Sequence, residues 1–207
     1  MTTSIETRSL SDQIKDALID DITTGARKPG ERLVEMKIAE DMQTSQAPVR
    51  EALRALEALG LVEMRRNRGA LVRKISTDEL RDIYVVRAAL EGLAAEVATT
   101  RCPDIAATLH EICAEMSNSQ DDRAAFVALN QQFHRTIVAA SRNMVLMDVW
   151  DKLDVRSRTA INVAQNARPL AVAIAEHFAI ADAMRQGDAQ AARALLIEHI
   201  VSAVNTP

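Results

Sequence analysis

The chain has 207 residues, of which 48% are hydrophobic, 26% charged and only 2% aromatic. This composition excludes a disordered chain, and no apolar run approaches the length needed to span a bilayer. The formal net charge of −4 argues against nucleic-acid binding by the chain as a whole. The length predicts one or two domains, and the abundance of Ala and Leu predicts more helix than strand.

The cellular compartment can be inferred from the N-terminus and the cysteines. The first residues, MTTSIETRS, lack the apolar segment of a signal peptide. Cys102 and Cys113 have neither the number nor the spacing of a disulfide framework or a zinc ribbon. We therefore expect a cytoplasmic protein with free thiols and no membrane partner.

The first predicted element is a helix over residues 9–22. Leu10, Ile14 and Leu18 repeat at four-residue steps and form an apolar stripe, and Gly25 marks the end of the helix. We expect this helix to pack against the two helices that follow and assign it no chemistry.

Two further helices joined by a tight turn predict a helix-turn-helix. The first covers residues 35–42, the turn residues 43–44, and the second residues 45–60, where Gly60 ends it. In this motif the second helix enters the major groove of DNA.

The second helix of this motif has a polar stripe beside its apolar face. We expect Ser45 to cap the helix through its hydroxyl and Pro48 to lie in the first turn, where no backbone donor is lost. Gln46, Arg50 and Arg54 line up along the helix at about 100° per residue. This stripe is a candidate DNA-contacting surface.

A basic hairpin follows directly. Strands are predicted at residues 61–64 and 70–72, and the loop between them contains Arg65, Arg66, Arg68 and Gly69. Residues 42–75 carry seven basic and three acidic side chains, whereas residues 76–207 carry 12 basic and 17 acidic ones. A local basic patch of this kind suits phosphate binding. The alternative is a surface helix and hairpin with a solvated charged face.

The order of motifs in this region resembles a known family. The string PGERL, then S-x-x-P-V-R-E-A-L, L-x-x-x-G-L and N-R-G-A-x-V resembles the winged helix-turn-helix of GntR-family transcription regulators over residues 9–74. The resemblance implies a DNA-binding domain at residues 1–75, with its contacts drawn from Ser45, Gln46, Pro48, Arg50, Arg54, Arg65, Arg66, Arg68 and Gly69.

Two positions depart from the family pattern. Family members usually carry arginine where this chain has Met36 and Gln46. Glutamine suits an adenine edge better than a guanine, so we expect an operator that differs from the commonest family half-site at the base read by Gln46.

Everything after residue 76 indicates helix. Residues 76–79, Ser-Thr-Asp-Glu, have the spacing of a capping box and mark the start of a second domain at residues 76–207. Six helices joined by short turns predict an all-α antiparallel bundle, so the fold is expected to be mainly α. They are expected at residues 77–102, 104–116, 121–140, 144–165, 169–187 and 189–204.

Three of the four histidines lie on apolar faces of different helices in this bundle. His177 lies ten residues before Gly187 and His199 twelve after it, which places both at nearly the same height on neighbouring antiparallel helices. Asn130 precedes His134 by one helical turn. Three imidazoles and one amide oxygen could therefore hold zinc or another divalent transition metal such as nickel or manganese. Taken singly, each histidine is more simply a hydrogen-bonded core residue.

The second domain also resembles a known family. The pieces LNQQFHR at 129–135, AEHFAI at 175–180 and GDAQAARALLIEH at 187–199 resemble the FCD domain of the FadR subfamily, VanR-like branch. The resemblance implies a metal site at Asn130, His134, His177 and His199, where Asp is usual in place of Asn130, and a small carboxylate or sugar acid bound against the metal.

Two more residues are candidates for contact with this effector. Arg87 resembles a family arginine that faces the pocket, although a surface or interhelical ion pair with Glu91 explains it equally well. Asn143 could reach the pocket from its turn, although an Asn that simply forms the turn is the simpler explanation.

Together these observations predict a metabolite-responsive repressor. It is expected to bind a near-palindromic operator as a homodimer, with effector binding linked to DNA affinity. An enzyme is disfavoured, because Glu176 and Glu198 point away from the neighbouring histidines and no HExxH or Gly-rich phosphate loop is present. The alternative is a regulator whose bundle only dimerises and whose histidines are structural.

Overall fold

The computed structural model describes residues 9–65, 69–119, 122–165 and 168–205. These residues form two compact units that divide between Ile75 and Ser76. No helix within the described ranges is long and apolar enough to cross a membrane.

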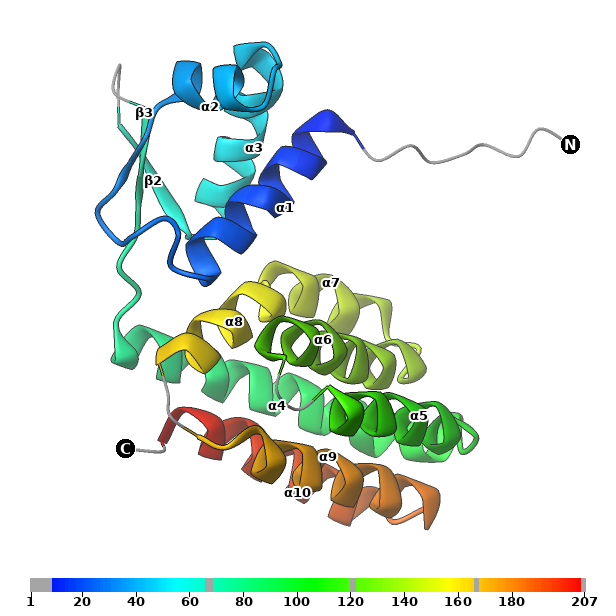
Figure 1. Ribbon diagram of the computed structural model, residues 1–207. Helices are drawn as coiled ribbons and strands as arrows, with labels where there is room; N and C mark the ends of the chain where they lie inside the picture. Colours follow the sequence, from blue (N-terminus) through cyan, green and yellow to red (C-terminus); the bar gives the residue numbers. More distant parts are fainter. Residues whose placement is uncertain (1–8, 66–68, 120–121, 166–167, 206–207) are drawn as a thin grey trace, which may run out of the picture. The chain divides into compact units, whose positions relative to one another are not determined.

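The first unit is a three-helix domain with a small sheet (Figure 1). Its helices are α1 (Leu10–Thr23), α2 (Glu35–Asp41) and α3 (Gln46–Ala58), and its strands are β1 (Arg32–Leu33), β2 (Val62–Arg65) and β3 (Gly69–Val72). The strands are antiparallel in the order β1-β3-β2. Strand β1 was not predicted from the sequence, because two residues are too few to show an alternating pattern.

The apolar faces expected from the sequence make the core of this unit. Ile14 and Leu18 of α1 are buried with Val49, Leu53 and Leu56 of α3. The Ser9 hydroxyl caps α1 by accepting a hydrogen bond from the Asp12 amide at 3.1 Å. The prediction that Ser45 caps α3 through its hydroxyl is wrong: its backbone has the extended conformation of a cap, but its side chain makes no capping hydrogen bond. Ser45 is exposed, so water can satisfy the first turn instead.

The second unit is a helical bundle built around α4. Its helices are α4 (Thr77–Arg101), α5 (Ile105–Asn118), α6 (Arg123–Ala140), α7 (Met144–Lys152), α8 (Val155–Gln165), α9 (Leu170–Arg185) and α10 (Ala189–Asn205). Helix α10 packs along α4 on one side, and α6 and α7 contact α4 on another (Figure 1). Gly92 permits the close approach of α10, because an added Cβ would lie 2.7 Å from the Ile197 side chain.

The mainly α fold, with a winged helix-turn-helix and a helical bundle, is as predicted, but the bundle has one helix more in the described residues. The helix expected at residues 144–165 is broken into α7 and α8. Asp154 adopts a left-handed conformation with φ +47° at the break, which an aspartate tolerates better than most residues. No glycine or proline marks this position in the sequence.

Candidate functional site

The first candidate surface is a groove of the N-terminal unit, formed by α2, α3 and the sheet. It brings together five of the residues predicted to contact DNA with others that the prediction did not include. The lining residues are Arg32, Val34, Glu35, Met36, Gln46, Arg50, Arg54, Met64, Arg65 and Gly69. Ser45 is exposed at the start of α3 and Pro48 is half-buried in its first turn. Arg66 and Arg68 lie outside the described residues.

An ion pair holds the central arginine of this groove. Glu35, the first residue of α2, accepts hydrogen bonds from Nε and Nη2 of Arg50 at 3.0 and 2.8 Å. The hydrogen bonds and the negative charge of Glu35 raise the pKa of the Arg50 guanidinium. This pair links α3 to α2 across the turn of the motif. The role of Glu35 could not be predicted from the sequence, because the two residues are fifteen positions apart.

Gly69 has a structural reason to be glycine. Its φ is +78°, and a Cβ at this position would lie 2.3 Å from the carbonyl oxygen of Leu33. The first residue of β3 thus packs directly against β1. This backbone contact with β1 positions Gly69 in the lining of the groove.

The second candidate site is the histidine cluster inside the helical unit. His134 of α6, His177 of α9 and His199 of α10 are buried, and one potential ligand atom from each lies within 4.8 Å of the others. The ring centroids of His177 and His199 are 4.4 Å apart, and those of His134 and His199 are 5.4 Å apart. The fourth histidine, His110, is half-buried and bonds to Asp182 instead.

Each of the three clustered imidazoles has its Nδ1 atom anchored to an acceptor. The acceptor is Oε2 of Glu91 for His134 at 2.5 Å, and Oε2 of Glu176 for His199 at 2.7 Å. His177 donates to the carbonyl oxygen of Ala173 at 2.7 Å. Because carboxylate and carbonyl oxygens only accept, Nδ1 carries the proton in each ring and a neutral ring keeps its lone pair on Nε2.

The Nε2 atoms are therefore the ring nitrogens that could bind a ligand. Those of His134 and His177 are buried and have no hydrogen-bond partner among the residues that the structure describes. Burial lowers the pKa of His134, and it lowers the pKa values of His177 and His199 well below the usual range, since neighbouring rings and Arg87 add to the cost of a further positive charge. The rings are neutral at neutral pH, which is the form that binds a metal.

Glu91 is the central carboxylate of the site and was not predicted as part of it. It is fully buried and accepts hydrogen bonds from Nε of Arg87 at 2.6 Å and from Nε1 of Trp150 at 2.7 Å, in addition to that from His134. Although burial opposes ionisation, Arg87 and His134 hold the pKa of Glu91 well below its usual range. The Arg87–Glu91 pair does form, but it lies within one helix and is buried, neither interhelical nor on the surface.

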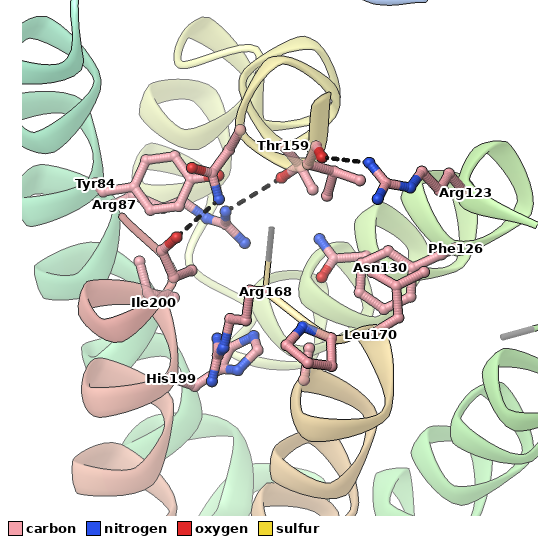
Figure 2. Close-up of a pocket in the computed structure, with 15 residues that line it drawn as sticks. Tyr84, Arg87, Arg123, Phe126, Asn130, Thr159, Arg168, Leu170, His199 and Ile200 are labelled. Atoms are coloured by element: carbon pink, nitrogen blue, oxygen red, sulfur yellow. Dashed lines mark hydrogen bonds between the residues drawn. The ribbon is translucent and has the colours of Figure 1, made fainter. Parts of the chain in front are cut away.

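A cavity of about 50 Å³ opens beside the cluster (Figure 2). Asn130 lines it, and the Nδ2 atom of this buried side chain has no hydrogen-bond partner within the described ranges. Arg87 reaches the cavity from α4, and its Nη1 donates to the Thr159 hydroxyl at 3.3 Å. The remaining lining residues are Tyr84, Arg123, Phe126, Asn162, Val163, Arg168, Pro169, Leu170, Ala173, His199, Ile200 and Ala203.

Asn143 is not among the residues that line this cavity. Its Oδ1 accepts a hydrogen bond from the Leu146 amide at 3.1 Å and caps α7. Of the two explanations considered from the sequence, the structure has the local one, because the side chain of Asn143 is used at the start of its own helix.

The donor set fits a divalent transition metal. Three neutral imidazoles form a common ligand set for zinc, and the Nε2 atoms of His134 and His177 are buried without a partner among the described residues. The oxygens that accept from the Nδ1 atoms are outer-shell partners typical of metal-binding histidines. Asn130 is buried, lines the cavity and lies one helical turn from His134, so it could offer a neutral amide oxygen where aspartate would offer a charged one.

Comparison with known proteins gives two family matches. A family described as "Bacterial regulatory proteins, gntR family" matches residues 10–72, and the FCD domain matches residues 82–202. The "Probable D-xylose utilization operon transcriptional repressor" of Paenarthrobacter nicotinovorans is 33% identical to this chain over 196 residues, which are 94% of this chain and 87% of the relative. The "HTH-type transcriptional repressor RspR" of Escherichia coli K12 is 25% identical over 203 residues, 94% of this chain and 87% of the relative.

Two solved structures share the fold. E. coli McbR/YncC superposes with a TM-score of 0.78 at 24% identity and covers 94% of each chain. A GntR regulator from Rhodococcus sp. RHA1 superposes with a TM-score of 0.76 at 21% identity, over 94% of this chain and 95% of the other. At these identities the two structures show the fold alone.

Proposed function

The chain belongs to the gntR family of bacterial regulatory proteins, with an FCD domain after its helix-turn-helix, and we propose that it is a repressor controlled by a metal-bound acid. Like its relatives, it is a DNA-binding transcription regulator and not an enzyme. In our proposal, a small carboxylate or sugar acid binds at a metal ion in the helical domain and releases the protein from a near-palindromic operator.

The convergence of the three histidines is the observation that supports this proposal most strongly. A purely structural histidine would use both ring nitrogens in hydrogen bonds or leave one to water. Here the Nδ1 atoms are bonded outward, while the buried Nε2 atoms of His134 and His177 have no partner among the described residues. Leaving these atoms unpaired is costly unless a ligand occupies the space between them.

We assign Asn130, His134, His177 and His199 as the metal ligands, with zinc as the best match and nickel or manganese as alternatives. When bound, the ion would act as a Lewis acid that attracts a carboxylate oxygen. Arg87 supports the same assignment, since a guanidinium beside the cavity can pair with a carboxylate. The name of the relative from Paenarthrobacter refers to D-xylose utilization, which makes a sugar-derived acid one candidate effector.

The operator is proposed to be contacted by the groove of the N-terminal unit, with one winged domain on each half-site. Gln46 would read a base edge beside Arg50, and we expect Gln46→Arg to shift the preferred base from adenine toward guanine. Binding of a randomised half-site library by both proteins measures this preference. An unchanged preference would exclude Gln46 from base readout.

A homodimer is proposed because one such domain reads only about half a site. Exposed aliphatic side chains on α4 and α7, two helices that pack against each other, could form the contact between copies. They are Val85, Val86, Leu93, Met144, Val145 and Val149. Effector binding would then change operator affinity by the difference in its affinity for the two states of the dimer.

Elemental mass spectrometry of the untagged protein, purified without chelators, tests the metal site. We expect about one metal ion per chain in the wild type, and its loss in His177→Ala. His110→Ala is the matched control, because His110 is a histidine of the same domain outside the cluster, and it should keep the metal. The absence of metal from all three proteins would instead favour a bundle that only dimerises, with structural histidines.

A further inference from the structure

The cavity beside the histidines is lined by positive side chains without a negative one. Arg87, Arg123 and Arg168 line it, and no Asp or Glu is among the described lining residues. Figure 2 shows the three arginines around the same space as Asn130 and His199. The nearby acids do not line the cavity but bond to residues that do: Glu91 pairs with Arg87, and Glu176 pairs with Arg168 and also accepts from His199.

The charges of the surrounding residues do not cancel. Arg87 and Arg168 are each offset by one carboxylate, whereas Arg123 donates to the carbonyl oxygen of Val163 at 2.9 Å and pairs with no carboxylate in the described part of the chain. A divalent ion held by three imidazoles and a neutral amide would add two more positive charges. An Asp in place of Asn130 would have removed one of them. Arg123 is exposed, so water screens its charge, whereas the two charges of the ion would lie among buried groups and would favour an anion with more than one negative group.

Two donors at the cavity also lack acceptors. The Nη1 atom of Arg168 and the Nδ2 atom of Asn130 are buried and have no hydrogen-bond partner among the described residues. Arg168 donates through Nη2 to Glu176, which orients the guanidinium, and Nη1 remains without an acceptor among the described residues. Acceptor oxygens on a ligand would satisfy both groups.

The size and the apolar lining limit the rest of the ligand. The cavity volume of about 50 Å³ exceeds the roughly 10–15 Å³ that one water needs, but it is small for a drug-sized molecule. Phe126, Leu170 and Ile200 supply apolar contacts between the charged groups. A short carbon chain fits this lining better than a bare inorganic anion does.

We infer that the effector is a small dicarboxylate, with one carboxylate toward the metal and Arg87 and the second held by Arg168 and Arg123. The inference rests on the proposed function and narrows it, since a monocarboxylate would leave the cavity with excess positive charge. Arg168 is then the residue that distinguishes diacids from monoacids. Glu176 positions Arg168 and the metal ligand His199 together.

Isothermal titration of the zinc-loaded full-length protein tests this inference with pairs of ligands matched in size. The diacids are oxalate, malonate, succinate and glutarate, and each is compared with its monoamide, which has one negative charge less. We expect at least one diacid to bind about tenfold or more tightly than its monoamide. In Arg168→Gln this preference should disappear. In Arg135→Gln, which changes an exposed arginine paired with Asp151, it should persist.

The outcomes separate this inference from the proposed function. Equal binding of diacids and monoamides would overturn the dicarboxylate inference and leave a metal-dependent monoacid sensor. Tighter binding of phosphate or sulfate than of any diacid would also overturn it. A metal content that survives in Arg168→Gln, measured together with its circular dichroism, shows that a lost preference is not due to unfolding. If that variant does not fold, Arg123→Gln provides the same test, and an undiminished preference there would contradict the inference.

Discussion

The side chain of Glu91 connects three helices of the bundle through hydrogen bonds. It bonds to a proposed metal ligand, to an arginine of the cavity and to the single tryptophan, which come from α6, α4 and α7. A buried carboxylate with three donors is stabilised as an anion, and in return it fixes the position of each donor. Glu91 would therefore act as a positioning residue for the proposed metal site, and a substitution there can be compared with substitutions of the proposed ligands.

We expect Glu91→Gln to weaken zinc binding by roughly 10- to 100-fold, the usual effect of losing an outer-shell partner. Glutamine keeps the size of the side chain but loses the charge that holds His134 in its tautomer and that offsets Arg87. Competition with a chromophoric chelator measures the affinity. Glu96→Gln is the control, because Glu96 is on the same helix and pairs with Arg193 at the surface. Equal zinc affinities for the two variants would refute the role of Glu91.

The buried histidines should make the stability of the protein depend on pH. Their pKa values are below the ordinary value of 6.5 in the folded protein, so the unfolded chain binds more protons as the pH falls through about 6.5. The free energy of unfolding of the metal-free protein should therefore decrease from about pH 6.5 downward. Glu91 acts in the same direction at lower pH: its folded pKa is depressed, so its contribution is lost as the pH falls below the unfolded value of 4.5.

Urea unfolding of chelator-treated protein at pH 7.5, 6.5 and 5.5 measures this dependence. His177→Ala should show a shallower loss of stability over that range than the wild type. A wild type that becomes more stable between pH 7.5 and pH 5.5 would show that the cluster does not bury neutral rings.

At the scale of whole elements, the strongly periodic helices were predictable and the local exceptions were not. The boundaries of α1, α3 and α4 follow from apolar repeats and caps, so they lie within one or two residues of the prediction. The break at Asp154 and the two-residue strand β1 arise from single backbone conformations and tertiary pairing, which no repeat encodes.

The same distinction applies to the site. His177 and His199 could be placed at one height, because a short turn joins their helices. The partners of the histidines could not be predicted, because Glu91 is 43 residues from His134 and Glu176 meets His199 only through the packing of α9 on α10. Glu176 was considered from the sequence only as a base beside His177, and its actual neighbour lies on another helix.

A further prediction concerns the β2–β3 hairpin, which is the wing of the winged helix-turn-helix. Arg65 ends β2, lies in the groove and pairs with Glu63 at 2.9 Å on the surface. If it contacts a phosphate, Arg65→Gln should reduce the slope of log K against log salt concentration by roughly 0.9. Fluorescence anisotropy with a labelled operator measures this slope. Arg81→Gln, in α4, should leave it unchanged, and an unchanged slope in Arg65→Gln would place the hairpin away from DNA.

For the whole molecule, the proposed function requires that two copies act together. A monomer would bring one groove to DNA and would have no partner subunit through which effector binding could alter operator binding. The aliphatic residues exposed on α7 are the clearest candidates for the contact, since Met144 and Val145 are 74% and 73% exposed. Exposed apolar clusters of this kind commonly mark association surfaces.

We expect Val145→Glu to separate the dimer without unfolding the chain, because a side chain this exposed in one copy tolerates a charge, whereas two carboxylates facing each other across a symmetric interface repel. Light scattering after gel filtration should fall from twice the chain mass of 22.7 kDa to that mass. Operator affinity should fall with it, since each separated chain holds only a half-site. Val172→Glu, on α9, is the control, because its side chain is exposed on a different helix. A Val145→Glu protein that stays dimeric would place the interface elsewhere, and the exposed residues of α4 would be tested next.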